Sequence, residues 1–261
     1  MYYKMLIQKE IWDGWRNYRF LIVSLGIAFF AIMNPVLDKL VLPSVLRSQF
    51  PNMPSEALDA MLLTTQIESI IGYFGSVFQV GILIMVFVLS GIVAQELTDR
   101  TFVLSVSTGK KYQDLILAKL IVYGTLLVSV TTISALVNYL YTGLFFGFDL
   151  PSPIPMLRAG MLQGVFMIFV LSMLNFIGSL VKKPMTTGLV VFMVVVGLRV
   201  IGGLLDIHGF LPTGLLVEGE LLTVAPSLQV ILQSLIITVL SIFVLIKLTI
   251  TRLNKMDITQ N

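Results

Sequence analysis

Six long apolar runs separated by polar segments dominate the chain. Each run has 18 to 23 residues, and only one contains a charge, Arg199. A bilayer core about 30 Å thick is crossed by about 20 apolar residues of α-helix. Lipid offers no hydrogen-bond partners to the backbone, so each run must be helical. The sequence therefore predicts an all-α integral membrane protein with six transmembrane helices, at 20–37, 74–94, 120–140, 159–181, 185–205 and 228–246.

Composition agrees with this prediction. Apolar residues make up 57% of the chain and charged residues 12%, well below the ~25% charged residues of a soluble domain. Six spans in 261 residues leave no room for a separate soluble domain. The absence of cysteine excludes disulfides, thiolate metal sites and cysteine nucleophiles.

The basic residues are distributed asymmetrically around the six runs. Thirteen of the 17 Lys and Arg residues lie on the side that holds both termini, three lie on the other side, and Arg199 lies within a run. Cytoplasmic loops of membrane proteins carry this excess of positive charge. We therefore predict a multi-pass membrane protein with both termini in the cytoplasm. We attribute the excess of basic residues to membrane topology, and we therefore expect no nucleic-acid partner.

The first nineteen residues form an amphipathic pattern of their own. At helical spacing, Ile11, Trp12 and Trp15 fall on an apolar arc, while Glu10 and Arg16 fall on a polar one. Such a helix suits the cytoplasmic headgroup layer of the lipid bilayer. We favour an interfacial helix at 1–19, followed by a six-span domain at 20–261; the alternative is a solvated extension of the first span.

Two outer loops carry further patterns. Ser55 is an expected N-cap of a short amphipathic helix whose apolar face extends to Thr65. The loop before the sixth run contains Asp206, Glu218 and Glu220 without basic residues. These acids either form an acidic vestibule or are simply the residues left outside by the charge asymmetry.

Arg199 is the single charge within a run, and charged groups in a membrane are costly and often functional. It lies six residues from the outer end of its run, which is about 9 Å of helix. Its side chain could extend to the outer surface near Asp206, or it could line a substrate pathway or a permease dimer contact. In the fourth run, Gly160 and Gly164 are spaced for close helix packing.

The cytoplasmic stretch 95–119 has the most distinctive loop sequence. Apolar Phe102, Leu104 and Val106 stand between charged flanks, and a glycine turn at Gly109 precedes the third run. Exposed apolar side chains between charges suit either a protein partner or a hairpin in lipid headgroups. The residues alone favour neither reading.

The same stretch resembles the cytoplasmic loop of type-2 ABC transporter permeases. That loop has an acidic residue, Gly-Thr, apolar residues, a Pro-Val-Ser-Arg-like turn and a final Lys. Here Arg100 replaces the Gly, and the turn lacks Pro. The six-span order, the N-terminal helix and the long first outer loop are also similar. The residues that would form the ATPase-coupling loop by this resemblance are Glu96, Arg100, Thr101, Phe102, Leu104, Val106, Lys110 and Lys119.

The resemblance implies a permease subunit of an ATP-driven transporter, an exporter in a prokaryotic plasma membrane. Its partners would be cytoplasmic ABC ATPase subunits and a second permease chain, identical or paralogous. The chain itself lacks a phosphate-binding loop, because Leu104 and Lys111 occupy the glycine and Ser/Thr positions around Gly109-Lys110. ATP would therefore be used by the partner subunit.

Catalytic patterns are also missing from the sequence. The single histidine, His208, excludes multi-histidine metal sites, no G-x-S-x-G occurs, and the apolar runs hold no pair of carboxylates. We expect no enzyme activity, cofactor or metal in this chain. The alternative function is an ATP-independent membrane carrier or a membrane assembly factor.

Overall fold

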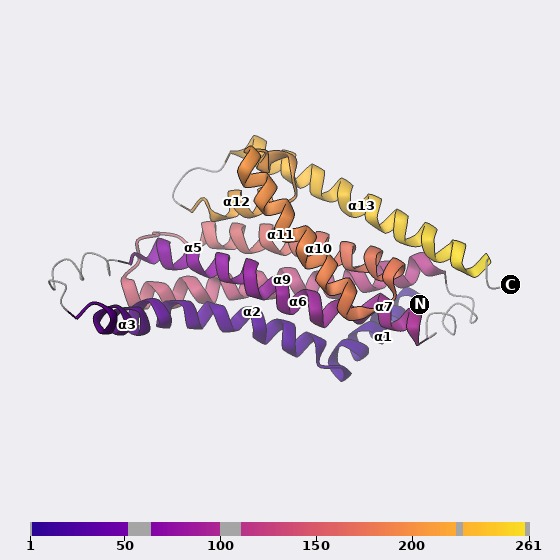
Figure 1. The fold of residues 1–261 in the computed structure, drawn as a ribbon, viewed down its shortest axis with the longest axis horizontal. Coiled ribbons are helices and arrows are strands. Elements are labelled where there is room, and N and C mark those ends of the chain that lie inside the picture. Colours follow the sequence, from indigo (N-terminus) through magenta and orange to yellow (C-terminus); the bar gives the residue numbers. More distant parts are fainter. Residues whose placement is uncertain (1, 52–63, 100–110, 223–226, 259–261) are drawn as a thin grey trace.

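The computed structural model describes residues 2–51, 64–99, 111–222 and 227–258, and these residues form helices joined by turns and short loops (Figure 1). Within them, six helical segments are long and apolar enough to cross a membrane. Each contains one of the six apolar runs, which confirms the predicted all-α class and number of spans. The segments are Arg19–Gln49, Gln66–Thr98, Tyr112–Phe146, Ile154–Val181, Pro184–Leu205 and Leu228–Met256.

Two of these segments are composite. The first consists of α2 (Arg19–Val36), the π-helical turn η1 (Leu37–Val41) and α3 (Leu42–Gln49), and the second of α5 (Gln66–Ser76), η2 (Val77–Gly81), α6 (Ile82–Leu89) and α7 (Gly91–Thr98). The others are α9 (Tyr112–Phe146), α10 (Ile154–Val181), α11 (Pro184–Leu205) and α13 (Leu228–Ile258), with η3 (His208–Phe210) and α12 (Gly214–Glu220) between the last two.

An N-terminal helix, α1 (Tyr2–Arg16), precedes the first span. Tyr18 separates α1 from α2 by adopting a left-handed conformation with φ of 57°. At this turn the Trp15 and Phe20 rings pack edge to face with centroids 5.9 Å apart. The separate N-terminal helix was expected, and it ends three residues before the predicted boundary at residue 19.

Thr65 has a different role from the one predicted. Its hydroxyl accepts a hydrogen bond from the Glu68 backbone N–H (3.2 Å), and the Glu68 carboxylate accepts one from the Thr65 N–H (3.0 Å). This reciprocal capping box begins α5. Thr65 is therefore the N-cap of the second span and not part of the predicted short amphipathic helix. Ser55, the predicted N-cap of that helix, lies outside the described residues.

The centre of the bundle is the pair α9 and α10, which approach closely at two glycines. A Cβ atom on Gly160 would lie 2.7 Å from the Thr132 Cα, and one on Gly164 would lie 2.7 Å from the Val128 Cα. The Thr131 hydroxyl donates a hydrogen bond to the Gly160 carbonyl at 2.9 Å. Only glycine fits these two positions, which confirms the packing role predicted from their spacing.

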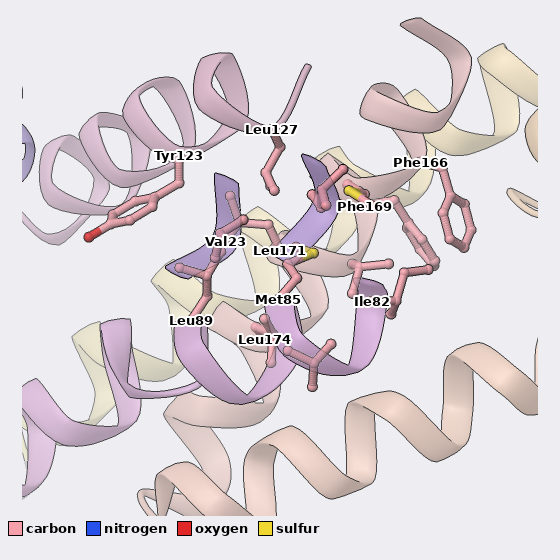
Figure 2. Packing of buried hydrophobic residues seen from close by; sticks show 14 of the residues in the cluster. Val23, Ile82, Met85, Leu89, Tyr123, Leu127, Phe166, Phe169, Leu171 and Leu174 are labelled. Carbon is pink, nitrogen blue, oxygen red and sulfur yellow. The ribbon is translucent and has the colours of Figure 1, made fainter. Parts of the chain in front are cut away.

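Other helices pack around this pair. Figure 2 shows side chains of α2, α6, α9 and α10 meeting in one buried cluster that includes Val23, Ile82, Met85, Leu89, Tyr123, Leu127, Phe166, Phe169, Leu171 and Leu174. Asn138 of α9 donates its side-chain amide N–H to the carbonyl of Ala31 in α2 at 3.0 Å. Burial is lowest in α11 and α13, so these two helices form the periphery of the bundle.

The N-terminus and the C-terminal end of α13 lie toward the same end of the molecule, which is also the end where α7 lies (Figure 1). An even number of spans requires this arrangement. Assignment of that end to the cytoplasm remains a prediction from the distribution of basic residues.

Candidate coupling junction

The second and third spans meet α1 at a polar centre, which we call the junction. It comprises Glu10 of α1, Glu96 and Thr98 of α7, Lys119 of α9 and Lys182 in the turn between α10 and α11. The stretch 100–110 lies between α7 and α9; Thr98 is the last residue of α7, and Lys119 lies about two turns into α9.

The strongest feature of the junction is an ion triad formed by Glu10, Lys119 and Glu96. The Lys119 Nζ donates hydrogen bonds to Glu10 Oε2 at 2.9 Å and to Glu96 Oε1 at 2.8 Å. The Lys119 side chain is 0% exposed, Glu10 2% and Glu96 19%. A buried ammonium is tolerated only with partners that replace its water. Lys119 therefore depends on both carboxylates, and it joins α1, α7 and α9.

Two further polar contacts position α1. The Tyr3 hydroxyl donates to Asp114 Oδ1 at 2.6 Å, near the start of α9. At the other end of α1, Arg19 of α2 donates to Asp13 Oδ2 at 2.8 Å. These contacts lie on either side of Glu10 in the sequence, so α1 is held along most of its length.

The end of α7 is also attached to the turn between α10 and α11. The Thr98 hydroxyl lies 2.6 Å from the Lys182 carbonyl and 2.9 Å from the Ala94 carbonyl of its own helix. Lys182 adopts a left-handed conformation with φ of 58° where α10 ends. This contact brings the turn between the fourth and fifth spans to the junction.

The sequence-predicted loop residues divide into two groups. Glu96 and Lys119 lie together in the ion triad. The remainder, Arg100, Thr101, Phe102, Leu104, Val106 and Lys110, lie outside the described residues. Glu10 was placed on the polar arc of the N-terminal helix but was not predicted as a partner of Lys119. The two positions are 109 residues apart, and no local pattern connects them.

Three carboxylates of this region lie close enough to suggest a cation site. Oxygens of Glu10, Asp13 and Glu96 are within 4.8 Å of one another. However, Lys119 is already bonded to the first and third, and Arg19 to the second. Protein ammonium and guanidinium groups supply the positive charge here, so the geometry describes an ion-pair network.

Arg199, the other predicted site residue, has an unexpected partner. Its Nη2 lies 2.9 Å and 3.1 Å from the two carboxylate oxygens of Glu220 in α12, and its guanidinium lies over the Phe78 ring, 4.6 Å from the centroid. The carboxylate that pairs with Arg199 is thus Glu220 of α12 and not Asp206, which the sequence placed near the same helix face. Asp206 is exposed and ends α11 in a left-handed conformation with φ of 52°.

The acidic loop before the sixth span does not form an open vestibule in the described part of the chain. Glu220 pairs with Arg199, and Glu218 is buried, which leaves only Asp206 exposed. The segment folds back against α10, where Arg158 donates to the Leu221 carbonyl. The packing of α12 therefore argues against the acidic vestibule, whereas the alternative based on charge asymmetry stays a prediction.

The geometry thus provides a polar, ion-paired junction at one end of a bundle of six helices that are long and apolar enough to span a membrane.

Comparison of the chain with protein-family models, curated proteins and solved structures finds no match.

Proposed function

We propose that this chain is the membrane-spanning permease subunit of an ATP-driven ABC exporter, coupled to separate cytoplasmic ATPase subunits. In this proposal the stretch 95–119 is the ATPase-docking loop, and a second permease chain completes the transport path. The plasma membrane of a prokaryote is the expected location. The proposed family rests on the resemblance of the loop sequence, and the proposed coupling rests on the contacts at the junction.

The observation that carries the proposal is the ion triad. Glu96 lies near the start of the stretch 95–119 and Lys119 at its end, and their side chains are bonded at 2.8 Å. A push on the loop would therefore move the ends of the second and third spans as one unit. Coupling requires an element whose two states respond to events at both sites, and in this proposal the second and third spans, joined at their base, are that element.

The same contact includes α1 through Glu10. The apolar arc of this helix is exposed, with Met5, Ile11, Trp12 and Trp15 all outside the protein core. Aromatic and apolar side chains beside cations suit the headgroup layer. In the proposed mechanism, α1 lies in that layer and provides a fixed point against which α7 and α9 tilt.

The test is recovery of the ATPase with a tagged chain. Interfaces draw most of their energy from a few anchors worth about 2 kcal/mol or more each, and Phe102 and Leu104 are the best candidates in the loop. Phe102→Ala combined with Leu104→Ala should release the ATPase without lowering the amount of permease in the membrane.

A matched control is Leu25→Ala combined with Phe29→Ala, two exposed side chains of α2. This control removes the same residue types from a lipid-facing helix and should retain the ATPase. Retention of the ATPase by the loop variant would contradict the docking role. A folded wild-type chain that recovers no ATPase would instead favour the ATP-independent carrier or assembly factor.

A further inference from the structure

A proline interrupts the hydrogen bonding of the first span near its outer end. Pro35 lies inside α2 and has no backbone N–H. The Ala31 carbonyl, four residues earlier, therefore lacks the hydrogen bond of a regular helix. The side-chain amide of Asn138 in α9 donates to this carbonyl at 3.0 Å, and Asn138 is 0% exposed. A buried side chain of the third span thus replaces the bond that the proline removes.

The π-helical turn η1 follows this proline almost directly. The Leu42 N–H bonds to the Leu37 carbonyl, five residues earlier, so the helix is locally wider than an α-helix. Helices bend at prolines and at π-bulges, and π-bulges are frequent at functional sites. Residues 35–41 therefore combine two causes of helix bending at one level of the first span.

Packing changes abruptly across residues 35–41. On one side, α2 has buried residues along its length from Phe20 to Pro35, and Asn34 donates its side-chain amide to the Ser76 hydroxyl of the second span at 3.1 Å. On the other side, no residue of η1 or α3 is buried. In Figure 1, α3 lies at the end of the molecule opposite the two termini. The bundle therefore holds α2 firmly and α3 only at its margin.

Two polar contacts join η1 to the neighbouring spans. The Ser69 hydroxyl of α5 donates to Asp38 Oδ2 at 2.6 Å. The Lys39 Nζ lies over the Phe146 ring at the end of α9, 5.2 Å from its centroid. Both contacts are made by single side chains of the π-turn, without a buried apolar surface behind them. They can therefore break and form again without unpacking the core.

We propose that residues 35–41 are a hinge and that α3, which we call the arm, pivots on it against the outer ends of the second and third spans. In one position the Asp38 and Lys39 contacts are made, and in the other they are broken. The bond from Asn138 stays intact in both positions, because Ala31 precedes the hinge. The arm thus moves without exposing an unpaired carbonyl to lipid, which would be costly.

The test is pulsed electron paramagnetic resonance on spin-labelled cysteine pairs of the full chain in lipid nanodiscs. Ser48 in the arm and Leu25 in α2 are each paired with Leu157 in α10, and all three side chains lie outside the core. The Ser48 pair should give a distance distribution broader by several ångströms than the Leu25 pair, as expected for a hinged element. Equal widths would overturn the hinge.

The proline supplies the decisive variant. Pro35→Ala restores an N–H for the Ala31 carbonyl, and it should narrow the Ser48 distribution to the width of the Leu25 pair. Pro43→Ala, in the first turn of α3 where a missing N–H is tolerated, is the matched control and should leave the width unchanged. An unchanged width in Pro35→Ala would also overturn the hinge.

A double-mutant cycle tests the role of Asn138. Asn138→Ala should lower the unfolding temperature more when Pro35 is present than in combination with Pro35→Ala, since the carbonyl then has a backbone partner. Equal decreases in the two backgrounds would show that Asn138 does not replace the missing bond. If Asn138→Ala does not fold, the distances in the chain with Asn138 still decide the hinge. All of these measurements use the purified chain alone, so their outcome is independent of ATPase docking and transport.

Discussion

Two charged centres lie within the bundle, and they differ in how much of the fold depends on them. The ion triad joins α1, α7 and α9, includes residues 109 positions apart, and surrounds a lysine with no exposed surface. The Arg199–Glu220 pair joins residues 21 positions apart in neighbouring elements, and its side chains are 26% and 23% exposed. The triad defines the tertiary arrangement of the junction, whereas the pair adds to a local one.

The largest expected effect comes from removing the centre of the triad. Lys119→Met leaves two carboxylates facing each other with no cation between them. Loss of one partner from a buried ion pair costs about 3–5 kcal/mol, and we expect a decrease of this size in the free energy of unfolding. Denaturant unfolding of the purified protein in detergent measures it.

Lys9→Met is the matched control, because Lys9 is an exposed lysine 3.5 Å from the same Glu10. Its replacement should change stability by about 0–1 kcal/mol, as for other surface ion pairs. Similar losses of unfolding free energy in the two variants would show that the buried triad contributes no more to stability than a surface ion pair.

Neutralising the carboxylates should have an intermediate effect. Glu10→Gln and Glu96→Gln each leave Lys119 one charged partner, and we expect losses of about 1–3 kcal/mol. Glu10→Gln should cost more, because Glu10 is 2% exposed and Glu96 is 19% exposed. Unfolding of the single and double variants tests the order. The double variant should lose more than the sum of the single losses, and simple additivity would count against a shared network.

Arg199→Leu should have a smaller effect on stability. Arg199 lies within an apolar run, where a charge is costly, so removal of the charge offsets the loss of its pair with Glu220. Thermal unfolding should therefore change little. If Arg199 contacts substrate or a second permease chain, ATP-dependent transport should fall at normal expression. Normal transport by the folded variant would limit Arg199 to a structural role.

The orientation of the two charged centres relative to the membrane can be tested with single cysteine substitutions, which should perturb the fold least. The chain contains no cysteine, so single cysteines give labelling without background. A cysteine at exposed Asp206 should react with an impermeant maleimide in intact cells, whereas one at exposed Lys183 should react only after lysis. The reverse pattern would place the junction outside the cell and exclude a cytoplasmic docking loop.

The sequence predicted the spans because length and apolarity decide membrane insertion locally. The helices extend beyond the apolar runs, since α9 has 35 residues, about 50 Å at helical rise, and includes the polar residues Gln113, Asp114 and Lys119 before its apolar run. The Thr65–Glu68 capping box was readable at short range and was missed. The partners of Lys119 and Arg199 were not predictable, because α1 and α12 reach them only through tertiary packing.

The close approach of α9 and α10 has a consequence for where a substrate could pass. With a Cβ on Gly160 or Gly164 already too near the backbone of α9, nothing of molecular size fits between these helices. The third and fourth spans therefore act as a solid wall throughout this part of the bundle. Any permeation route must follow another surface of the molecule, and a larger residue at either glycine would open the wall instead of narrowing a channel.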